Sequence, residues 1–371
     1  MEYLGIVKLK SNSFKLNKLK WQINLNLKFS NFQKIILIVS IILAIKYYNG
    51  PAENVYFKQR WLDGKTLKEA SSNKLLKPWH QSLTSKNIFF HETSLIEDGI
   101  IRLNARQACA IESAALTNPN HNIFVMFASQ VGFRNTSELP IIDALLSYPN
   151  INLNYLNVTK YAENTPLENW IKTDALFRSK YVAVHTADVL RLLSLFKYGG
   201  SHIDLDIVVM QSLDSQGAQN FAGAEEHDSV NNAFIHLTGE SGHKIAEKLV
   251  GEIKNNFNGR DWAHNGPRAL TRVLSKICGT KDVKKMTEND ICENFKVLPI
   301  EKCYNITWFE NRMFFEEKHL ERTLDRLMDS LMVHIWNSQN AKIPLTKNDN
   351  VAYIHLARKY CPKTLKACDK F

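Results

Sequence analysis

The segment from Gly200 to Asp206 constrains this chain more than any other. It follows a helix-like run and leads into the apolar residues 207–210, so it predicts a strand that ends at the edge of a core. Because alternate side chains of a strand point to opposite faces, we expect Asp204 and Asp206 to share one face and Leu205 to point inward. Two adjacent carboxylates suit a hard divalent cation, although a solvated strand end is the alternative interpretation.

Basic residues are concentrated at the N-terminus. The 371 residues carry a formal net charge of +10, and seven lysines against one acid give residues 1–34 a charge of +6. The rest of the chain is therefore close to neutral for its length. This distribution argues against a nucleic-acid-binding domain.

An apolar run at 35–45 follows the basic tail. At about 1.5 Å per residue it is short for a bilayer core of about 30 Å, but a span from Phe29 to Tyr48 would suffice if flanking lysines reach the interface. A cleaved signal peptide and a buried core helix are the alternatives. We favour a single-pass signal-anchor at 35–48, with residues 1–34 in the cytoplasm and the remainder of the chain in the lumen.

Two further features fit an oxidising, luminal environment. All six cysteines follow the predicted anchor and permit up to three disulfides. The sequence contains no C-x2-C pair, which argues against a metal site formed by thiols. Three N-x-S/T sequons also follow the anchor and predict glycosylation at Asn135, Asn157 and Asn305.

Helical and strand-like patterns alternate along the body of the chain. Residues 49–85 are polar and predict a stem, and residues 86–371 predict one luminal domain. We expect strands at 86–94, 123–127 and 151–156, and a helix at 103–116. This alternation indicates βαβ units and a mostly parallel sheet.

A further helix is expected directly before the acidic segment. Thr186 can cap its start, and Gly199 with Gly200 can end it. Asp188 and Arg191 lie three residues apart and so share one face of that helix. One interpretation is an exposed ion pair between them. In the other, both side chains lie over the strand end and contact the sugar and phosphate of a bound donor.

Together these residues resemble the donor-sugar-binding D-x-D region of glycosyltransferases. More closely, the chain resembles the α-1,4-glycosyltransferase family typified by lactosylceramide 4-α-galactosyltransferase. Its similar segments, in order, are 89–94 (FFHETS), 106–115 (RQACAIESAA), 231–234 (NNAF), 262–267 (WAHNGP), 270–273 (LTRV), 333–337 (VHIWN) and 358–362 (RKYCP). Two positions depart from the family pattern, with His202 in place of Tyr and Ala187 in place of Ser. The departures concern the choice of donor sugar or acceptor.

The resemblance implies a GT-A fold, a Rossmann-like α/β domain that binds a UDP-sugar and a divalent ion, Mn²⁺. It implies Asp206 as the main metal ligand, Asp204 as a contact to metal or ribose, and His334 as a further ligand. The alternative for His334 is a hydrogen-bonded core histidine beside Trp336. Residues implied in donor binding are Asp188, Arg191, Gly199, Gly200 and Asp204.

Enzymes of this kind retain the anomeric configuration of the sugar. A double displacement needs a carboxylate nucleophile, and Glu225 and Asp261 are candidates outside the matched motifs. A front-face reaction needs no nucleophile and is the preferred hypothesis. Asn231 and His264 would then orient sugar and acceptor.

The resemblance thus predicts a retaining enzyme of the Golgi membrane, single-pass type II, with its catalytic domain in the lumen. It would transfer galactose or N-acetylgalactosamine from a UDP-sugar in α-1,4 linkage to a galactose-type acceptor on a glycosphingolipid. One alternative is a D-x-D mannosyltransferase that uses GDP-mannose on glycoproteins. The other is a catalytically inactive luminal binding protein on the same fold.

Overall fold

The computed structural model describes residues 74–75, 77–78, 86–94, 100–128, 132–133, 139–217, 220–288 and 291–371. All of them belong to one compact unit, Ala52–Phe371. No helix within these ranges is long and apolar enough to cross a membrane. The predicted basic tail, the predicted anchor at 35–48 and the sequon at Asn135 lie outside the described residues.

A central sheet of eight strands organises the fold, in the order β11-β9-β10-β7-β3-β4-β6-β2. The strands are β2 (Lys77–Pro78), β3 (Asn87–Glu92), β4 (Asn122–Phe127), β6 (Ile151–Tyr155), β7 (Gly200–Ile203), β9 (Asn220–Glu226), β10 (Ser229–Leu237) and β11 (Phe295–Leu298). Within this sheet β10 is antiparallel to both neighbours, and every other pair is parallel. The predicted α/β class with a mostly parallel sheet is therefore confirmed.

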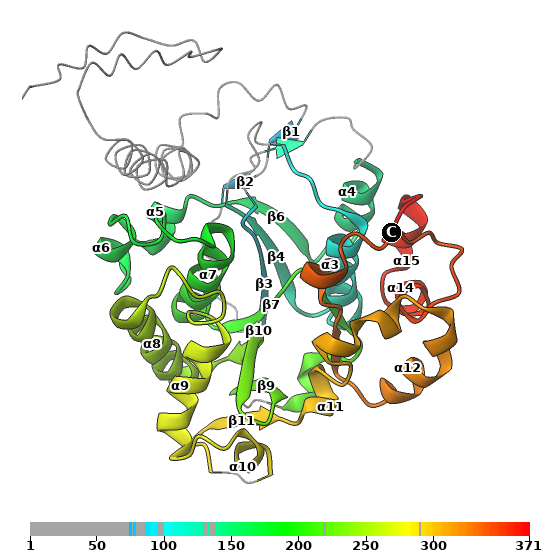
Figure 1. The fold of residues 1–371 in the computed structure, drawn as a ribbon. Helices are drawn as coiled ribbons and strands as arrows, with labels where there is room; N and C mark the ends of the chain where they lie inside the picture. Colours follow the sequence, from blue (N-terminus) through cyan, green and yellow to red (C-terminus); the bar gives the residue numbers. More distant parts are fainter. Residues whose placement is uncertain are drawn as a thin grey trace, which may run out of the picture. The chain divides into compact units, whose positions relative to one another are not determined.

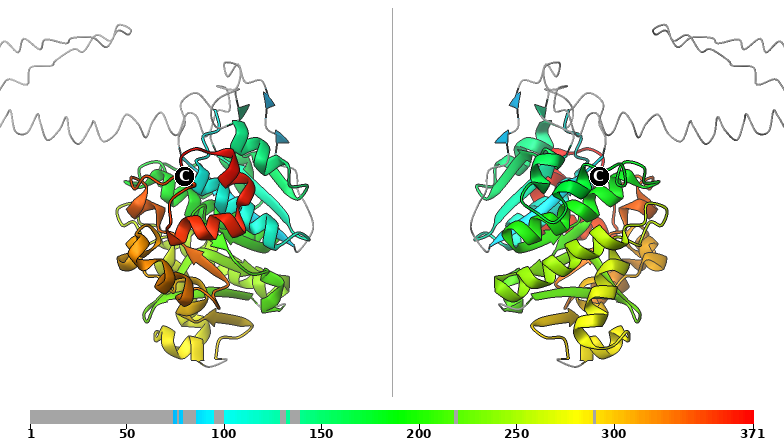
Figure 2. Two further views of the ribbon diagram at one scale, coloured as in Figure 1. Left: turned by 90° about the vertical axis from the view of Figure 1, so that its right-hand side faces the viewer. Right: turned by 90° about the vertical axis from the view of Figure 1, so that its left-hand side faces the viewer.

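Helices cover both faces of the sheet, as Figures 1 and 2 show. One face carries α7 (Val182–Tyr198), α8 (Gly239–Asn256) and α9 (Pro267–Cys278), and the other carries α3 (Ala105–Thr117), α14 (Ala352–Tyr360) and α15 (Pro362–Ala367). Phe89 and Phe90 are adjacent on β3 and fully buried in two separate cores, because successive strand side chains point to opposite faces. Strands whose two faces are both covered by helices consist of consecutive apolar residues, and β4 has such a sequence.

Shorter elements connect this frame. Two small sheets pair β1 (Lys74–Leu75) with β5 (Gly132–Phe133), and β8 (Ile207–Val209) with β12 (Met332–His334). The other helices of the described residues are α4 (Leu139–Leu146), α5 (Val158–Ala162), α6 (Glu168–Ile171), α10 (Val283–Glu288), α11 (Ile300–Cys303), α12 (Leu320–Arg326), α13 (Asn337–Asn340), η2 (Leu213–Gln216), η3 (Trp308–Phe314) and η4 (Glu317–His319). β1 and β2 fall within the range predicted as a stem, and β2 joins the central sheet beside β6.

The expected strands and the expected Ala-rich helix are confirmed as β3, β4, β6 and α3. The predicted helix start at Thr186 is wrong, because α7 begins four residues earlier, at Val182. Val182 is buried in the core on that side of the sheet, so packing extends the helix beyond the residue suited to cap it. The helix ends as predicted, at Gly199.

Four of the six cysteines form disulfides. Cys278 pairs with Cys292 at the end of α9, and Cys109 of α3 pairs with Cys361, which directly precedes α15. The other two, Cys303 and Cys368, are free and buried. Of the three disulfides that the sequence permits, the structure forms two.

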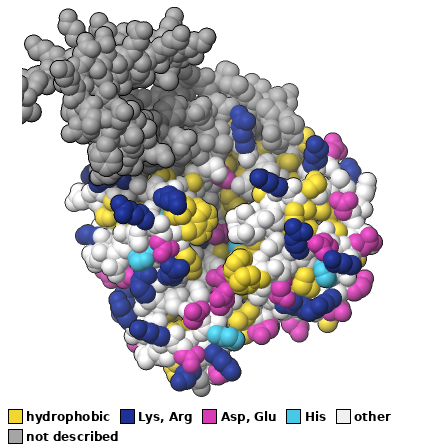
Figure 3. Space-filling view, viewed as in Figure 1, with side chains coloured by type: hydrophobic (Ala, Val, Ile, Leu, Met, Phe, Trp, Pro, Cys, Tyr) yellow, Lys and Arg dark blue, Asp and Glu magenta, His cyan; other side chains and the backbone are white. Residues whose placement is uncertain are grey.

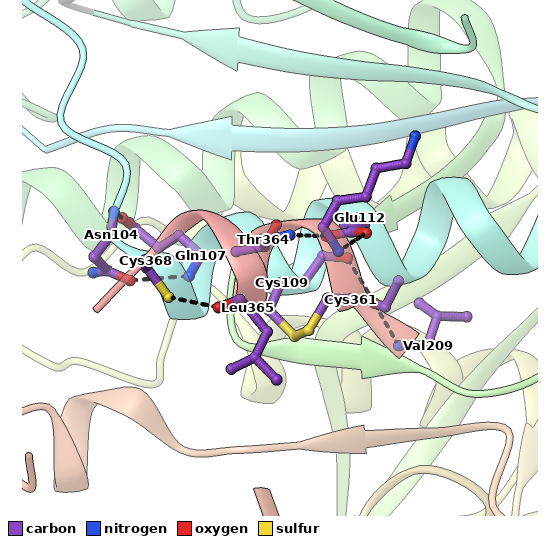
Figure 4. The surroundings of a disulfide bond; sticks show 12 residues. Asn104, Gln107, Cys109, Glu112, Val209, Cys361, Thr364, Leu365 and Cys368 are labelled. Carbon is purple, nitrogen blue, oxygen red and sulfur yellow. Dashed lines mark hydrogen bonds between the residues drawn. A yellow bond between two sulfur atoms is a disulfide. The ribbon is translucent and has the colours of Figure 1, made fainter. Parts of the chain in front are cut away.

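A buried carboxylate reinforces the joint between α3 and α15 (Figure 4). Glu112 is fully buried and accepts hydrogen bonds from the backbone N–H groups of Lys363 and Thr364, at 2.9 and 2.7 Å. The hydroxyl of Tyr148 donates a third hydrogen bond to it, at 2.7 Å. The first N–H groups of a helix have no partner within the helix, so Glu112 supplies acceptors for two of them.

We predict that Glu112→Gln lowers the free energy of unfolding by about 1–3 kcal/mol, because an amide NH₂ group replaces an oxygen that faces backbone donors. Urea denaturation of the full-length chain measures the change. Glu321→Gln, at an exposed position on α12, is the matched control and should have no measurable effect. Equal stability of the two variants would contradict the proposed joint.

Candidate metal and donor site

The acidic segment forms a tight turn between two strands. β7 ends at Ile203, and the N–H of Ile207, the first residue of β8, donates to the Asp204 carbonyl at 3.2 Å. The prediction that Asp204 and Asp206 share one face of an extended strand is therefore wrong. The two carboxylates nevertheless lie together, because the turn brings them to the same side.

Two glycines set the approach to this turn. Gly199 ends α7 with a φ of 62°. Gly200 has a φ of 94°, and a Cβ atom there would lie 2.3 Å from the Asn87 carbonyl oxygen of β3. Backbone conformation and close packing account for both glycines without a ligand. Their implied role in donor binding stays a prediction.

The three residues implied as metal ligands lie together. Ligand atoms of Asp204, Asp206 and His334 are all within 4.8 Å of one another. His334 reaches the cluster because β12 pairs with β8, opposite Ile207. Its Nε2 atom is 3.0 Å from Asp206 Oδ1, and the N–H of Asn337 donates to Asp206 Oδ2 at 3.0 Å.

This donor set fits a divalent cation. Two carboxylates and an imidazole are ligands that Mn²⁺ and similar ions accept. Burial disfavours the charged form of His334, but Asp206 and Asp204 outweigh burial and raise its pKa above the ordinary value. The cluster thus attracts positive charge. The His334 ring packs edge-on against Trp336 with centroids 3.9 Å apart, and its buried Nδ1 atom has no hydrogen-bond partner.

A buried guanidinium lies behind the turn. Arg191 Nη2 is 3.1 Å from Asp204 Oδ1 and 3.6 Å from Asp188 Oδ1, and Nη1 donates to the Asn232 carbonyl at 2.6 Å. The Asp188 and Arg191 side chains are only 4% and 5% exposed, so their interpretation as an exposed ion pair is wrong. Burial works against the charged form of Asp204, yet Arg191 and His202 hold its pKa well below the usual range.

Asp188 carries an unsatisfied oxygen. Its Oδ1 atom accepts a hydrogen bond from Asn232 Nδ2 at 2.8 Å, whereas Oδ2 is buried without a partner. Burial raises the pKa of this carboxyl, and Arg191 opposes the shift. A Cβ atom on Gly266 would lie 2.7 Å from Asp188 Oδ1 and 2.8 Å from Asn232 Nδ2, so the 262–267 segment closes tightly over the pair.

Asn232 and Gly266 are therefore site residues that the sequence analysis missed. Both belong to segments that carry the family resemblance, NNAF and WAHNGP, which is the signal that could have identified them. The neighbouring Asn231 was selected instead. Its Oδ1 atom accepts from the backbone N–H of Ala233 at 2.7 Å.

The other predicted catalytic residues differ in their surroundings. Burial raises the pKa of Glu225, while His334 and a hydrogen bond from Asn231 oppose the shift, so Glu225 interacts electrostatically with His334. His264 Nε2 instead lies 2.9 Å from the Asn256 carbonyl at the end of α8. Asp261 pairs with the exposed Arg268 at 2.6 Å. Neither His264 nor Asp261 contacts the carboxylate cluster in the described part of the chain.

Two predicted glycosylation sites lie in the described residues. Asn157 caps α5, since its Oδ1 atom accepts from Lys160 N–H at 2.9 Å. The Asn305 amide donates to the Arg326 carbonyl. Glycosylation stays a prediction at both positions.

In space-filling view the molecule is hollowed near the middle of one face (Figure 3). Acidic side chains lie along the border of this hollow.

Two conserved family regions match the chain. The alpha 1,4-glycosyltransferase conserved region matches residues 238–368, which include His334. The glycosyltransferase sugar-binding region containing a DXD motif matches residues 104–222, which include Asp204 and Asp206. The two regions thus divide the predicted metal ligands between them.

Known proteins are similar over most of the chain. Human lactosylceramide 4-alpha-galactosyltransferase is 29% identical over 289 residues, which are 76% of this chain and 78% of the relative. Human alpha-1,4-N-acetylglucosaminyltransferase is 24% identical over 264 residues, 70% of this chain and 75% of the relative. Among solved structures, the galactosyltransferase LgtC in complex with donor and acceptor sugar analogs has a TM-score of 0.36 at 11% identity, covering 67% of this chain and 87% of that one.

The matched regions meet at one site. The turn with Asp204 and Asp206 comes from the first region, and His334 from the second. The chain belongs to the α-1,4-glycosyltransferase family and is a glycosyltransferase with a DXD sugar-binding region.

Proposed function

We propose that the enzyme, on a GT-A fold, transfers galactose or N-acetylgalactosamine from a UDP-sugar in α-1,4 linkage to a glycosphingolipid with a terminal galactose. The anomeric configuration of the sugar is retained. The observation that carries the proposal is the cluster of Asp204, Asp206 and His334 beside the unpartnered Oδ2 atom of Asp188. The similarity to lactosylceramide 4-alpha-galactosyltransferase supports the glycolipid acceptor.

Asp206, Asp204 and His334 would hold Mn²⁺, which supplies positive charge for the diphosphate of a leaving UDP. The chain's own residues prepare this site. Arg191 binds the Oδ1 atom of Asp204, not Oδ2, and keeps the Asp204 carboxylate ionised. The Oδ2 atom of Asp188 is a buried hydrogen-bond acceptor without a partner, which a hydroxyl of the donor sugar would satisfy.

The preferred front-face reaction needs no protein nucleophile, and Asn231 would orient the sugar. A role for His264 in orienting the acceptor requires that its ring leave the Asn256 carbonyl. Of the two carboxylates considered for a double displacement, Glu225 is the one that interacts electrostatically with His334. Asp261 is engaged by Arg268.

We further propose that the enzyme is a single-pass type II protein of the Golgi membrane. The basic tail at 1–34 and the apolar run at 35–45 support this topology. An anchored enzyme and its glycolipid share one membrane surface, which raises their encounter rate. The two disulfides and the sequons are compatible with a luminal body.

The deciding experiment gives the purified full-length chain a panel of donors: UDP-galactose, UDP-N-acetylgalactosamine, UDP-N-acetylglucosamine and GDP-mannose. Lactosylceramide and a glycoprotein are the acceptors, each with Mn²⁺ or with EDTA. We expect Mn²⁺-dependent α-1,4 transfer of galactose or N-acetylgalactosamine to the lipid. Transfer only from GDP-mannose, or no transfer from any donor, would overturn the proposal in favour of one of the two alternatives.

Asp206→Asn should lower kcat/KM by about 10²–10³-fold, a loss of roughly 3–4 kcal/mol, similar to the loss of one strong electrostatic contact in a transition state. Its Mn²⁺ affinity, measured by calorimetry, should fall in parallel. The matched control is Asp369→Asn, whose carboxylate is fully exposed. Unchanged Mn²⁺ binding by the Asp206 variant would rule out its assignment as a ligand.

Gly266→Ala should raise the KM for the donor about tenfold, because the new methyl group pushes Asp188 and Asn232 apart. Gly251→Ala is the matched control, since a Cβ atom at that helical position meets no neighbour within 4 Å. The control should keep its activity and gain roughly 0.5–1 kcal/mol of stability. An unaltered KM in Gly266→Ala would show that the donor does not use the Asp188 pair.

A further inference from the structure

A chain of buried hydrogen bonds leads from the interior to Asp204. The hydroxyl of Tyr161 is 2.8 Å from Ser194 Oγ, which is 2.8 Å from His91 Nε2. His91 Nδ1 is 3.2 Å from His202 Nδ1, and His202 Nε2 is 2.8 Å from Asp204 Oδ1. All four side chains behind Asp204 are at least nine-tenths buried. They come from α5, α7, β3 and β7, so the chain connects four elements.

Chemistry fixes the direction of these bonds from the carboxylate backward. An ionised carboxylate only accepts, so His202 Nε2 carries a hydrogen and donates to Asp204. In a neutral ring the other nitrogen is then an acceptor. Because His202 Nδ1 accepts, His91 Nδ1 must donate to it, and His91 Nε2 becomes the acceptor in its turn.

The same reasoning continues to the far end. Ser194 has a single hydroxyl hydrogen, and two acceptors lie within its reach, His91 Nε2 at 2.8 Å and the Leu190 carbonyl at 2.9 Å. The Tyr161 hydroxyl must therefore supply the hydrogen in its contact with Ser194. Burial raises the pKa of Tyr161 well above its ordinary value, which keeps the phenol protonated. The donors of Tyr161, His91 and His202 thus point toward Asp204, and hydrogen bonds aligned in one direction polarise one another.

In the competing arrangement His202 is doubly protonated and donates from Nδ1 to His91 and from Nε2 to Asp204. A second buried cation beside Arg191 would then be required. His202 is 1% exposed, and Arg191 already places a positive charge on the same oxygen of Asp204. A second buried charge there is costly, so the one-directional arrangement with neutral rings is favoured.

His202 and Arg191 both bind the same oxygen of the carboxylate. His202 Nε2 lies 2.8 Å and Arg191 Nη2 3.1 Å from Asp204 Oδ1. Two donors on one oxygen fix the orientation of the group, and Oδ2 is left for a ligand. A tyrosine at position 202, as in the related motif, would carry its only polar side-chain atom at the far end of the ring. Its ring would offer His91 no acceptor.

We propose that His202 and His91 are positioning residues, which act as a pair to orient Asp204 toward the divalent cation and the donor. The inference rests on the proposed function for the identity of the cation and the donor. It explains why a histidine at 202 accompanies a histidine at 91 on the adjacent strand, where Phe89 and His202 are in register. The pair extends the hydrogen-bond support of Asp204 into the interior.

Two isosteric substitutions test the contacts of the two ring nitrogens of His202 separately. In His202→Gln the amide nitrogen can occupy the place of Nε2 and keep the bond to Asp204. In His202→Asn the amide reaches only the place of Nδ1, so contact with Asp204 is lost while contact with His91 remains. We expect the Asn variant of the full-length chain to bind Mn²⁺ about 10–100-fold more weakly, and the Gln variant to stay within about threefold of the wild type.

The hydrogen positions are measured directly by ¹⁵N NMR of the metal-free, full-length wild-type chain labelled at histidine. We expect neutral rings, with the hydrogen on Nε2 of His202 and on Nδ1 of His91. A doubly protonated His202, or a hydrogen on its Nδ1 atom alone, would contradict the proposal. This measurement stays informative if a substituted chain does not fold.

A purely structural role for His202 predicts equal Mn²⁺ affinity in the two variants, with differences only in melting temperature. That result would also contradict the proposal. Neither Mn²⁺ binding nor the ring protonation depends on sugar transfer. A wild-type enzyme that binds Mn²⁺ but transfers no sugar from any donor would therefore count against the proposed function and leave this inference standing.

Discussion

The site depends on one buried cation, the guanidinium of Arg191. It lies between two carboxylates, Asp188 and Asp204, and donates to the backbone of β10 through Asn232. A buried charge is tolerated only when it is paired and hydrogen-bonded, and each group here meets that condition through the others. Removal of Arg191 would leave the buried carboxylate of Asp188 without a cation, and Asp204 with His202 as its remaining partner. The helix, the turn and β10 are thus connected electrostatically as well as by packing.

The body of the fold could be predicted from local patterns. β3 and β4 contain short apolar runs next to turn-forming residues, which indicate buried parallel strands, and β6 alternates apolar and polar residues. The start of α7 could not be predicted, because the burial of Val182 overrides the capping preference of Thr186. Tertiary packing, which has no local signature, decided that boundary.

The three residues predicted as metal ligands do lie together, but for a reason that the structure corrects. Strand alternation suggested that Asp204 and Asp206 lie side by side, whereas a turn brings them together. His334 was assigned only through a family resemblance, since it is far away in the sequence and reaches the site through the β8–β12 pair. The partners of Asp204 behind the turn were not predicted, because His91 lies in a strand that reads as core.

The reversed direction of β10 explains why these distant residues meet. Phe234 of β10 pairs with Ile203, the last residue of β7. Because β10 is antiparallel to β7, the residues that precede Phe234 extend past the end of β7, alongside the turn. There the Ala233 carbonyl accepts from Asp204 N–H at 2.8 Å, and Asn232 reaches both Arg191 and Asp188. A parallel neighbour would end level with β7 at the same edge of the sheet. The single antiparallel strand therefore supplies a second wall for the site where the parallel strands end, and ligands of open α/β sheets bind at such edges.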